Sequence, residues 1–210
     1  MSTKTRDTYT GLYVIARKNK KVEDKMTDNN NNNNNDNDND NINESTSNLN
    51  IVQPDLNIEH SLYSELSSQF KDKVQLVYTK PNRIKIYVKP EHIIEVAFFL
   101  KSQLGLDHAE SVSGTDYPNE DVIEVIYHLN SYSREEIAPI IFALSTKTDR
   151  NSSYLPSLLP VFKSVEYHER ETYEMLGVYF QGHPRNERFL LPEDWADIPP
   201  LKKEFRIKGR

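Results

Sequence analysis

The sequence predicts an α+β domain, in which a small mixed or antiparallel sheet packs with two to three helices and an extended, irregular C-terminal region follows. Apolar residues recur at every fourth position in residues 56–70, which is typical of an amphipathic helix. They alternate in residues 73–79 and 83–88, on either side of Pro81-Asn82, which is typical of a hairpin. Four or five such strands together with the helices make an α+β domain.

The middle of the chain continues this mixture of helix and strand. Pro90 and Gly105 bracket a helix over residues 91–104, because Pro suits the first helical position and Gly the C-terminal cap. Residues 109–115 and 121–129 predict two strands joined by a turn. The second strand is apolar on both faces, so we expect it to be central in the sheet and covered on both sides.

The next part of the chain is less regular. Residues 136–144 are predicted to be a strand, in which Pro139 favours an edge position or a bulge. Residues 145–153 are polar and predict a loop, and residues 155–162 predict a short helix or turn. No internal repeat is visible.

A charged helix over residues 165–176 is the most unusual stretch of the chain, with Ser164 as its expected N-cap and a last strand at residues 178–180. Four ionisable residues lie within six positions of it: Glu169, Arg170, Glu171 and Glu174. Gly177 falls where a helix cap needs a positive φ. One interpretation is a solvated face whose ion pairs each add well under about 1 kcal/mol. The other is a set of charges fixed for a partner or a site.

Composition excludes several functions. The net charge is −6, and residues 28–50 carry five acidic side chains and no Lys or Arg, so the rest is close to neutral and no nucleic-acid surface is predicted. The chain has no Cys, which excludes disulfides, thiolate nucleophiles and iron–sulfur ligation by Cys. No apolar run approaches the length that spans a bilayer, so we expect membrane association only through partners.

We expect four regions along the chain. Residues 1–27 form an N-terminal extension, and residues 28–50 form an Asn- and Asp-rich insertion that should be disordered. Residues 51–180 form the α/β core domain. Residues 181–210 form an extended C-terminal docking segment.

Other chemistry receives little support from the sequence. His168-Glu169 resembles the start of a zinc-protease motif, but Thr172 stands where the second His is required, so no metal site is predicted. Glu169 with Glu171 or Glu174 is a candidate acid–base pair without an identified pocket. Gly182, His183 and Pro184 most simply form a turn with a buried, hydrogen-bonded His, and a ligand role for His183 is the alternative.

The end of the chain is basic and carries apolar residues. Lys202, Lys203 and Glu204 lie between Leu201 and Phe205, and three further basic residues follow. Such a segment suits an acidic partner surface. The alternative is a frayed terminus.

Taken together, several motifs resemble the 30-kDa subunit family of respiratory complex I, whose mitochondrial members are called NADH dehydrogenase subunit 9. The motifs occur in the family's order over residues 56–205: Asp116-Tyr117-Pro118, Glu124 to Leu129, Pro156-Ser157, Glu169-Arg170-Glu171, Met175-Leu176-Gly177, Gly182-His183-Pro184 and Pro200 to Phe205. Glu-Arg-Glu followed by Gly-His-Pro at this spacing is a specific signature of that family.

The resemblance implies a cofactor-free structural and assembly subunit in the peripheral arm of NADH:ubiquinone oxidoreductase. It implies no catalytic, cofactor-binding or metal-ligating residue in this chain, with NADH, FMN, iron–sulfur clusters and ubiquinone on partner subunits. The implied neighbours are the 49-kDa-type quinone-site subunit and the cluster-bearing subunit beside it. The implied location is peripheral, on the matrix side of the mitochondrial inner membrane.

Within that resemblance, the charged residues acquire structural and interface roles. Arg170, with Glu169, Glu171 and Glu174, would order the helix end and the turn at His183. Arg188 and residues 202–206 would dock the C-terminal segment on neighbours.

The chain also departs from the family pattern. Glu174 replaces an Asp, Leu176 replaces an aromatic residue, and only Arg188 remains of a family Asp-Leu-Arg-Arg. Lys202, Lys203 and Glu204 replace Arg-Lys-Asp, which keeps the charge but loses the planar fork of Arg. Three alternatives stay open. The first is the equivalent subunit of a related membrane-bound hydrogenase, the second is a stand-alone hydrolase that uses the carboxylates of Glu169 to Glu174, and the third is a soluble scaffold unrelated to respiration.

Overall fold

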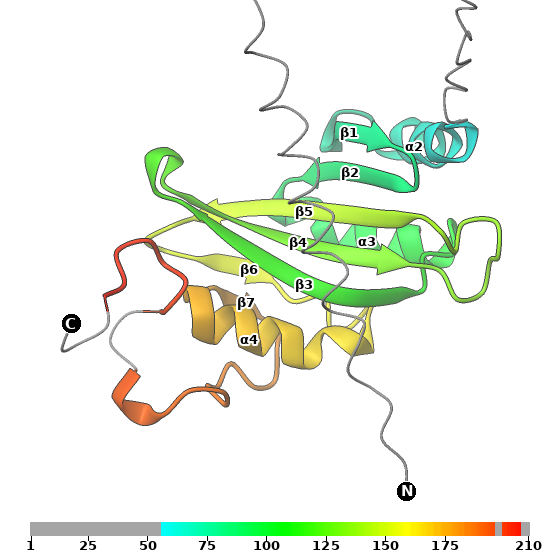
Figure 1. Cartoon of the computed structure of the whole chain (residues 1–210). Helices are drawn as coiled ribbons and strands as arrows, with labels where there is room; N and C mark the ends of the chain where they lie inside the picture. The colour runs from blue at the N-terminus through cyan, green and yellow to red at the C-terminus, as the bar shows by residue number, and fades with distance from the viewer. Residues whose placement is uncertain (1–55, 196–198, 207–210) are drawn as a thin grey trace, which may run out of the picture. The chain divides into compact units, whose positions relative to one another are not determined.

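The computed structural model describes residues 56–195 and 199–206 (Figure 1). The predicted N-terminal extension and Asn-rich insertion lie outside the described residues. The main elements are α2 (Asn57–Phe70), β1 (Val74–Lys80), β2 (Arg83–Val88), α3 (Ile93–Ser102), β3 (His108–Tyr117), β4 (Val122–Asn130), β5 (Ile141–Asp149), β6 (Tyr154–Pro156), α4 (Glu166–Leu176) and β7 (Tyr179–Gln181). The α+β prediction is confirmed.

The main sheet has five strands in the order β1-β2-β5-β4-β3. All neighbouring pairs are antiparallel except β2 and β5, which run parallel with Ile86 opposite Leu144. The sheet is therefore mixed. A second sheet contains only β6 and β7, which also pair in parallel.

The hydrophobic core lies on one face of the main sheet, against the helices. Figure 1 shows α3 behind β4 and β5, α2 beside β1, and α4 running along β3. Alternate side chains of the strands point into this core, which is why one face of each strand is apolar. Fully buried members include Ile84, Ile86, Tyr127, Phe142 and Leu144 from the strands, and Leu66 and Leu100 from the helices.

The prediction for residues 136–153 was wrong. The strand runs over Ile141–Asp149 in the centre of the sheet, and Pro139 lies in the preceding turn rather than at an edge or bulge. Ser145, Thr146 and Thr148 in the second half of β5 are buried. Ser145 Oγ donates to the Ile86 carbonyl at 3.0 Å and Thr148 Oγ1 to the Tyr154 carbonyl at 3.1 Å, whereas Thr146 Oγ1 has no partner among the described residues. The sequence predicts a loop here because these residues are polar, although they are buried inside the protein.

Two further predictions need correction. Strand β4 lies between β5 and β3, as expected for an inner strand, but only one of its faces is fully buried. On the other face Val122, Ile126 and His128 are half-buried. Residues 155–162, predicted as a short helix or turn, begin instead as strand β6 and continue as a turn.

A close approach between α4 and β3 positions the charged helix on the sheet. Gly114 of β3 has no side chain, and a Cβ added there would overlap Leu176 Cδ1. Because of this approach, the carboxylates of α4 reach both the sheet and the C-terminal region.

Candidate functional site

Helix α4 ends as the sequence predicts, but its charges are not a solvated face. Gly177 caps the helix with φ +80°, and its amide donates to the Tyr173 carbonyl at 2.8 Å. Glu169, Arg170 and Glu174 are buried, and Glu171 alone of the four is exposed. The interpretation of exchangeable surface ion pairs therefore does not hold for the three buried residues.

Glu169 is a fully buried carboxylate that receives three hydrogen bonds. Tyr127 Oη donates to it at 2.9 Å, Ser157 Oγ at 2.6 Å and the Leu158 amide at 2.8 Å. Burial raises the pKa of Glu169, and these three donors oppose that rise. Burial and the neighbouring Glu169 charge also raise the pKa of Tyr127 well above its usual value. Glu169 thus ties α4 to β4 and to the loop after β6.

Glu174 holds the start of the C-terminal region. Its carboxylate accepts the amides of Phe189, Leu190 and Leu191 at 2.9, 2.8 and 2.8 Å, and Arg188 Nε lies 3.5 Å away. Burial alone would raise the pKa of Glu174, but the three amides and the Arg188 charge outweigh it and lower the pKa. Successive backbone amides form a cradle for an anion, and here the anion is the protein's own carboxylate.

Arg170 is held by aromatic rings rather than by a carboxylate. Its guanidinium carbon lies 4.4 Å from the centroid of the Phe189 ring and 5.6 Å from that of Tyr167. Its Nε donates to the Glu187 carbonyl at 3.3 Å. Within the described residues no carboxylate comes within ion-pair distance of Arg170, so it orders the C-terminal region through cation–π contacts.

His183 occupies the turn after β7 and uses both ring nitrogens. The turn begins at Gly182, which adopts φ +87°. The Arg185 amide donates to His183 Nδ1 at 3.0 Å, so Nε2 carries the proton that it donates to the Glu166 carbonyl at 3.0 Å. This is the buried, hydrogen-bonded role expected from the sequence, and it leaves neither nitrogen free for a ligand. Pro184 follows, exposed, and completes the turn.

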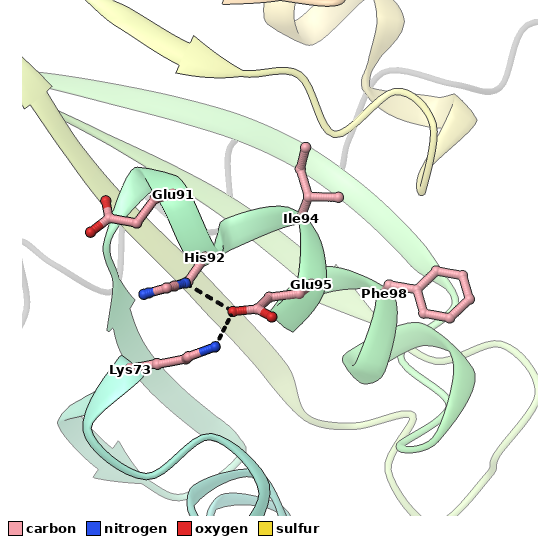
Figure 2. Close-up of a pocket in the computed structure, with 6 residues that line it drawn as sticks. All are labelled: Lys73, Glu91, His92, Ile94, Glu95 and Phe98. Carbon is pink, nitrogen blue, oxygen red and sulfur yellow. Dashed lines mark hydrogen bonds and ion pairs between the residues drawn. The ribbon is translucent and has the colours of Figure 1, made fainter.

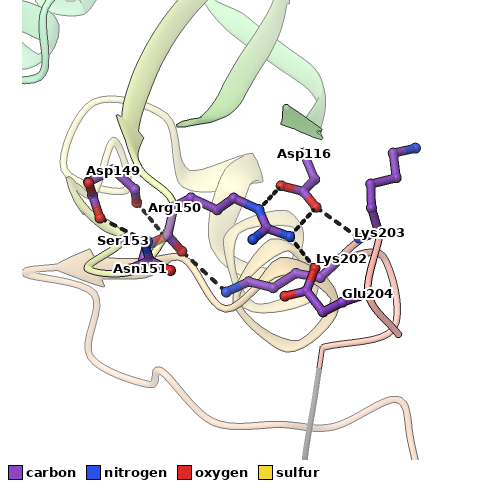
Figure 3. Close-up of polar contacts among 8 residues, drawn as sticks. All are labelled: Asp116, Asp149, Arg150, Asn151, Ser153, Lys202, Lys203 and Glu204. Carbon is purple, nitrogen blue, oxygen red and sulfur yellow. Dashed lines mark hydrogen bonds and ion pairs between the residues drawn. The ribbon is translucent and has the colours of Figure 1, made fainter. Parts of the chain in front are cut away.

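Residues 202–204 are held by a third buried carboxylate, Asp116 at the end of β3, and by its partner Arg150 (Figure 3). Arg150, just after β5, donates to Asp116 from Nε at 2.6 Å and from Nη2 at 3.0 Å, and also pairs with Glu204. The Lys203 amide donates to Asp116 at 2.8 Å, and Lys202 Nζ donates to the Arg150 carbonyl at 3.2 Å. We call these five residues the terminal clasp.

Arg150 and Asp116 were not identified as site residues from the sequence. The hydrogen bond from Arg150 lowers the pKa of Asp116, although burial opposes that effect. Asp116 was placed in a predicted turn and Arg150 in a predicted loop, so nothing indicated that they meet. The one available signal was an isolated Asp beside a Tyr-Pro pair at a strand end.

The surface depression shown in Figure 2 lies along α3, and none of the carboxylates of α4 lines it. It has a volume of about 630 Å³ and is lined by Lys73, Glu91, His92, Ile94, Glu95 and Phe98. Lys73 Nζ and His92 Nδ1 lie 2.7 and 2.9 Å from Glu95, and the hydrogen bond from Lys73 lowers the pKa of Glu95. A carboxylate with a lowered pKa is poorly suited to act as a general acid or base near neutral pH.

Metal ligation and membrane insertion find no support in residues 56–195 and 199–206. No group of three or more His, Asp or Glu side chains there is arranged to hold a metal ion. None of the helices in that part is both long and apolar enough to cross a membrane.

Comparison with known families identifies the chain's relatives. The model of the family described as "Respiratory-chain NADH dehydrogenase, 30 Kd subunit" matches residues 86–210, which is more than half of the chain. The chain belongs to this family. The 30-kDa match begins in β2 and includes the carboxylates of α4 and the whole terminal clasp, so the resemblance drawn from the motifs is confirmed.

Individual relatives in the 30-kDa family are found in archaea and bacteria. A subunit of the F(420)H(2) dehydrogenase of Methanosarcina mazei is 34% identical over 146 residues, which cover 69% of this chain and 90% of that protein. A subunit of the NADH-quinone oxidoreductase of Roseiflexus sp. strain RS-1 is 39% identical over 127 residues, which cover 59% of this chain and 70% of that protein. The match to each spans most of the relative's length.

Solved structures support the 30-kDa fold. A chain in the membrane-bound sulfane sulfur reductase, an archaeal respiratory membrane complex, superposes with a TM-score of 0.60 at 17% identity, covering 72% of this chain and 87% of that chain. A trypsin-resistant fragment of Nqo5 superposes with a TM-score of 0.52 at 20% identity, covering 60% of this chain and 98% of the fragment. At these identities the similarity shows the fold alone.

Proposed function

We propose that this chain is a cofactor-free structural and assembly subunit of the peripheral arm of NADH:ubiquinone oxidoreductase, which supports electron transfer from NADH to ubiquinone. The observation that carries the proposal is membership of the 30-kDa family, together with 39% identity to a subunit of a bacterial NADH-quinone oxidoreductase. A chain without Cys supplies no thiolate for an iron–sulfur cluster. The proposal places the clusters, and with them NADH, FMN and ubiquinone, on partner subunits.

The geometry of the buried charges supports a structural role. Glu169, Glu174 and Asp116 each receive three or more hydrogen bonds or ion pairs from this chain, and each fixes a loop or a part of the C-terminal region. Three such contacts occupy most of the roughly four acceptor sites of a carboxylate. This favours the structural role over a stand-alone hydrolase.

The expected neighbours are the 49-kDa-type quinone-site subunit and the adjacent cluster-bearing subunit. Large apolar side chains of the C-terminal region remain exposed, with Phe189 at 41%, Leu190 at 48% and Leu201 at 55%. Glu174 holds the backbone of the first two, so their side chains are presented in a fixed direction. Exposed apolar side chains on ordered backbone are typical of a protein interface.

We also propose a peripheral location on the matrix side of the mitochondrial inner membrane. The Methanosarcina and Roseiflexus relatives are archaeal and bacterial, and in such a cell the same position corresponds to the cytoplasmic face of the plasma membrane. Fractionation of cells into mitochondria and plasma membrane, with immunodetection of this chain, distinguishes the mitochondrial location from the plasma-membrane location.

A second candidate is the equivalent subunit of a related membrane-bound complex, such as a hydrogenase. The F(420)H(2) dehydrogenase subunit of Methanosarcina aligns with more of this chain than the Roseiflexus protein does, which favours keeping this candidate. The two candidates differ in the electron donor that the purified complex oxidises.

The test is native electrophoresis of detergent-solubilised membranes, with immunodetection of this chain and an in-gel stain for NADH oxidation. We expect the chain in a very large NADH-active band. A chain found in a large band that oxidises hydrogen or a deazaflavin instead of NADH would support the second candidate. A chain that runs alone near its 24.5 kDa mass would contradict both.

A further inference from the structure

The terminal clasp divides the last described residues into an inward and an outward side. We infer that residues 199–206 are closed onto the domain in the free chain. We further infer that Leu201, Lys203 and Arg206 are the side of this segment that docks on an acidic surface of a neighbouring subunit. The docking half of this inference rests on the proposed function, whereas the closure of the clasp does not.

The inward side is held by contacts that belong to this chain alone. The Leu201 amide donates to the Met175 carbonyl of α4 at 2.9 Å, and the Lys203 amide donates to Asp116 at 2.8 Å. Lys202 and Glu204 contact the backbone and side chain of Arg150. The anchors therefore come from α4, from the end of β3 and from the residue after β5.

Releasing the segment from the domain would be costly. The Asp116 side chain is fully buried and the Arg150 side chain is only 14% exposed. If residues 199–206 left, Asp116 would lose its amide donor and Arg150 its contact with Glu204. Partly satisfied buried charges are strongly unfavourable, so the closed state is expected without any partner.

Two short turns and an aromatic contact add to this closure. The Lys202 amide donates to the Pro199 carbonyl at 3.1 Å, and the Phe205 amide donates to the Lys202 carbonyl at 3.0 Å. The Phe205 ring stacks on Trp195, with centroids 5.7 Å apart. The segment is thus folded internally as well as anchored.

The outward side has a surplus of positive charge. In the clasp, Arg150 pairs with the carboxylates of both Asp116 and Glu204, and the Lys202 charge also acts on Asp116, so two carboxylates face two cations. Lys203 contributes only its backbone amide to the clasp, and Figure 3 shows its side chain pointing away from Asp116.

Arg206 completes this outward side. Its guanidinium donates only to the backbone carbonyls of Lys203 and Phe205, so its charge is not matched by a carboxylate there. Leu201 lies beside these two cations in the chain and is 55% exposed. Two unmatched cations around an exposed apolar side chain fit a partner surface with carboxylates around an apolar spot.

Not all of the residues that were predicted to dock face outward. Lys202 and Glu204 were expected to dock on neighbours, but their charged groups face this domain. In our inference the side chains of Lys203 and Arg206 keep the docking role. Replacing Lys202 or Glu204 should then affect assembly only through the clasp.

Closure is tested by amide hydrogen exchange of the free, full-length chain, read residue by residue by NMR. We expect the Lys203 amide to exchange at least about tenfold more slowly than in an unstructured chain. Asp116→Asn should remove that protection and leave the Leu190 amide protected by Glu174. Glu174→Gln should do the reverse. A Lys203 amide that exchanges at the unstructured rate in the wild type would overturn the closure.

If Asp116→Asn misfolds, the Leu190 amide will also lose its protection. A second variant is then needed to test the closure. Glu204→Gln leaves the buried Asp116–Arg150 pair intact and removes one anchor. We expect it to increase the exchange of Lys203 by a few-fold, with the remaining amides unchanged. Unchanged Lys203 exchange in both variants would also overturn the inference.

Docking is tested by the amount of chain recovered in the large native complex. The pair Lys203→Glu and Arg206→Glu should reduce incorporation several-fold while the Lys203 amide stays protected in the free chain. The matched control is Lys80→Glu with Lys89→Glu, which changes the net charge equally at two other exposed positions. Incorporation of the first pair at the control level would overturn the docking side. If the wild-type chain joins no large complex, the proposed function fails, and the exchange result stands by itself.

Discussion

Arg150 donates two hydrogen bonds to Asp116, at 2.6 and 3.0 Å, from the residue after β5 to the end of β3 and past the intervening strand β4. The Asp116 side chain has no exposure to solvent. A planar fork that meets both oxygens of a buried carboxylate fixes the distance and the angle between two parts of the sheet. This pair is therefore the best point at which to test the energetics of the C-terminal region.

Replacing Arg150 with Met should leave Asp116 buried without its main partner. We expect a loss of about 3 kcal/mol in the free energy of unfolding, because breaking one half of a buried ion pair leaves an uncompensated charge. Urea denaturation followed by circular dichroism measures it. Lys147→Met is the matched control, since the ion pair of Lys147 with Glu120 is exposed and should change stability by less than about 1 kcal/mol. Equal losses in the two variants would show that the Asp116 pair has no special weight.

The pH dependence of stability should report Glu174. Its pKa is lowered in the folded chain, so its stabilising contribution is present above the unfolded pKa and is lost as the pH falls through the folded pKa. Glu174→Gln should therefore be less stable than the wild type by about 1–3 kcal/mol at pH 7, because its amide group cannot accept from all three backbone donors.

The gap between these two proteins should close as the pH falls below about 4.5, the ordinary value for Glu. Urea titrations at a series of pH values measure the gap. Glu171→Gln at the exposed neighbouring position serves as the control and should show almost no gap. A gap for Glu174→Gln that stays constant down to pH 3 would contradict a lowered pKa.

The close approach of β3 and α4 should make Gly114 intolerant of a side chain. Gly114→Ala would place a methyl group into Leu176 Cδ1, and overpacking of this kind costs about 1–3 kcal/mol. Gly182→Ala is the informative comparison, because no atom lies within 4 Å of its added Cβ and only the positive φ opposes it.

A double-mutant cycle identifies the contact responsible. Leu176→Val shortens the side chain that Gly114→Ala meets, so the two changes together should cost less than their sum. Additive losses would mean that the strain at Gly114 comes from the backbone and not from Leu176.

Arg170 should matter through its planar group more than through its charge. Arg170→Ala removes the guanidinium that contacts the rings of Tyr167 and Phe189, and we expect less chain in the large native complex because Phe189 loses its support. Arg170→Lys keeps the charge without the planar stack and should be intermediate. Native electrophoresis measures the level, and Arg83→Ala at an exposed position is the control. Wild-type levels in Arg170→Ala would remove the role assigned to this residue.

Local patterns predicted much of the fold. The helix at residues 165–176, its end at Gly177 and the hairpin of β1 and β2 follow from periodicity and from a residue that tolerates positive φ, and both signals lie within a few positions of the chain. Strand β5 was misplaced for a physical reason. Ser145 and Thr148 are polar, yet Ser145 donates to a carbonyl of the distant strand β2 and Thr148 to a carbonyl of the next strand, β6, and periodicity does not contain that information.

The candidate site shows the same limit. Glu174 and Arg170 were identified because they stand in one crowded stretch, but their partners at residues 187–191 were not predictable from spacing. Arg150 was missed altogether, because both of its carboxylate partners are remote in the chain. Contacts of this kind appear only when the strands are paired.

The parallel pairing of β2 with β5 also bears on how the chain folds during synthesis. Ile84 lies opposite Phe142, and the whole of α3, β3 and β4 is made between these two residues. Until Phe142 emerges from the ribosome, β2 has β1 on one side and an open edge on the other. Long-range pairings form slowly, and open edges beside apolar side chains promote aggregation. A stall in translation before residue 141 should therefore leave an intermediate that depends on chaperones, whereas a stall after residue 149 should not.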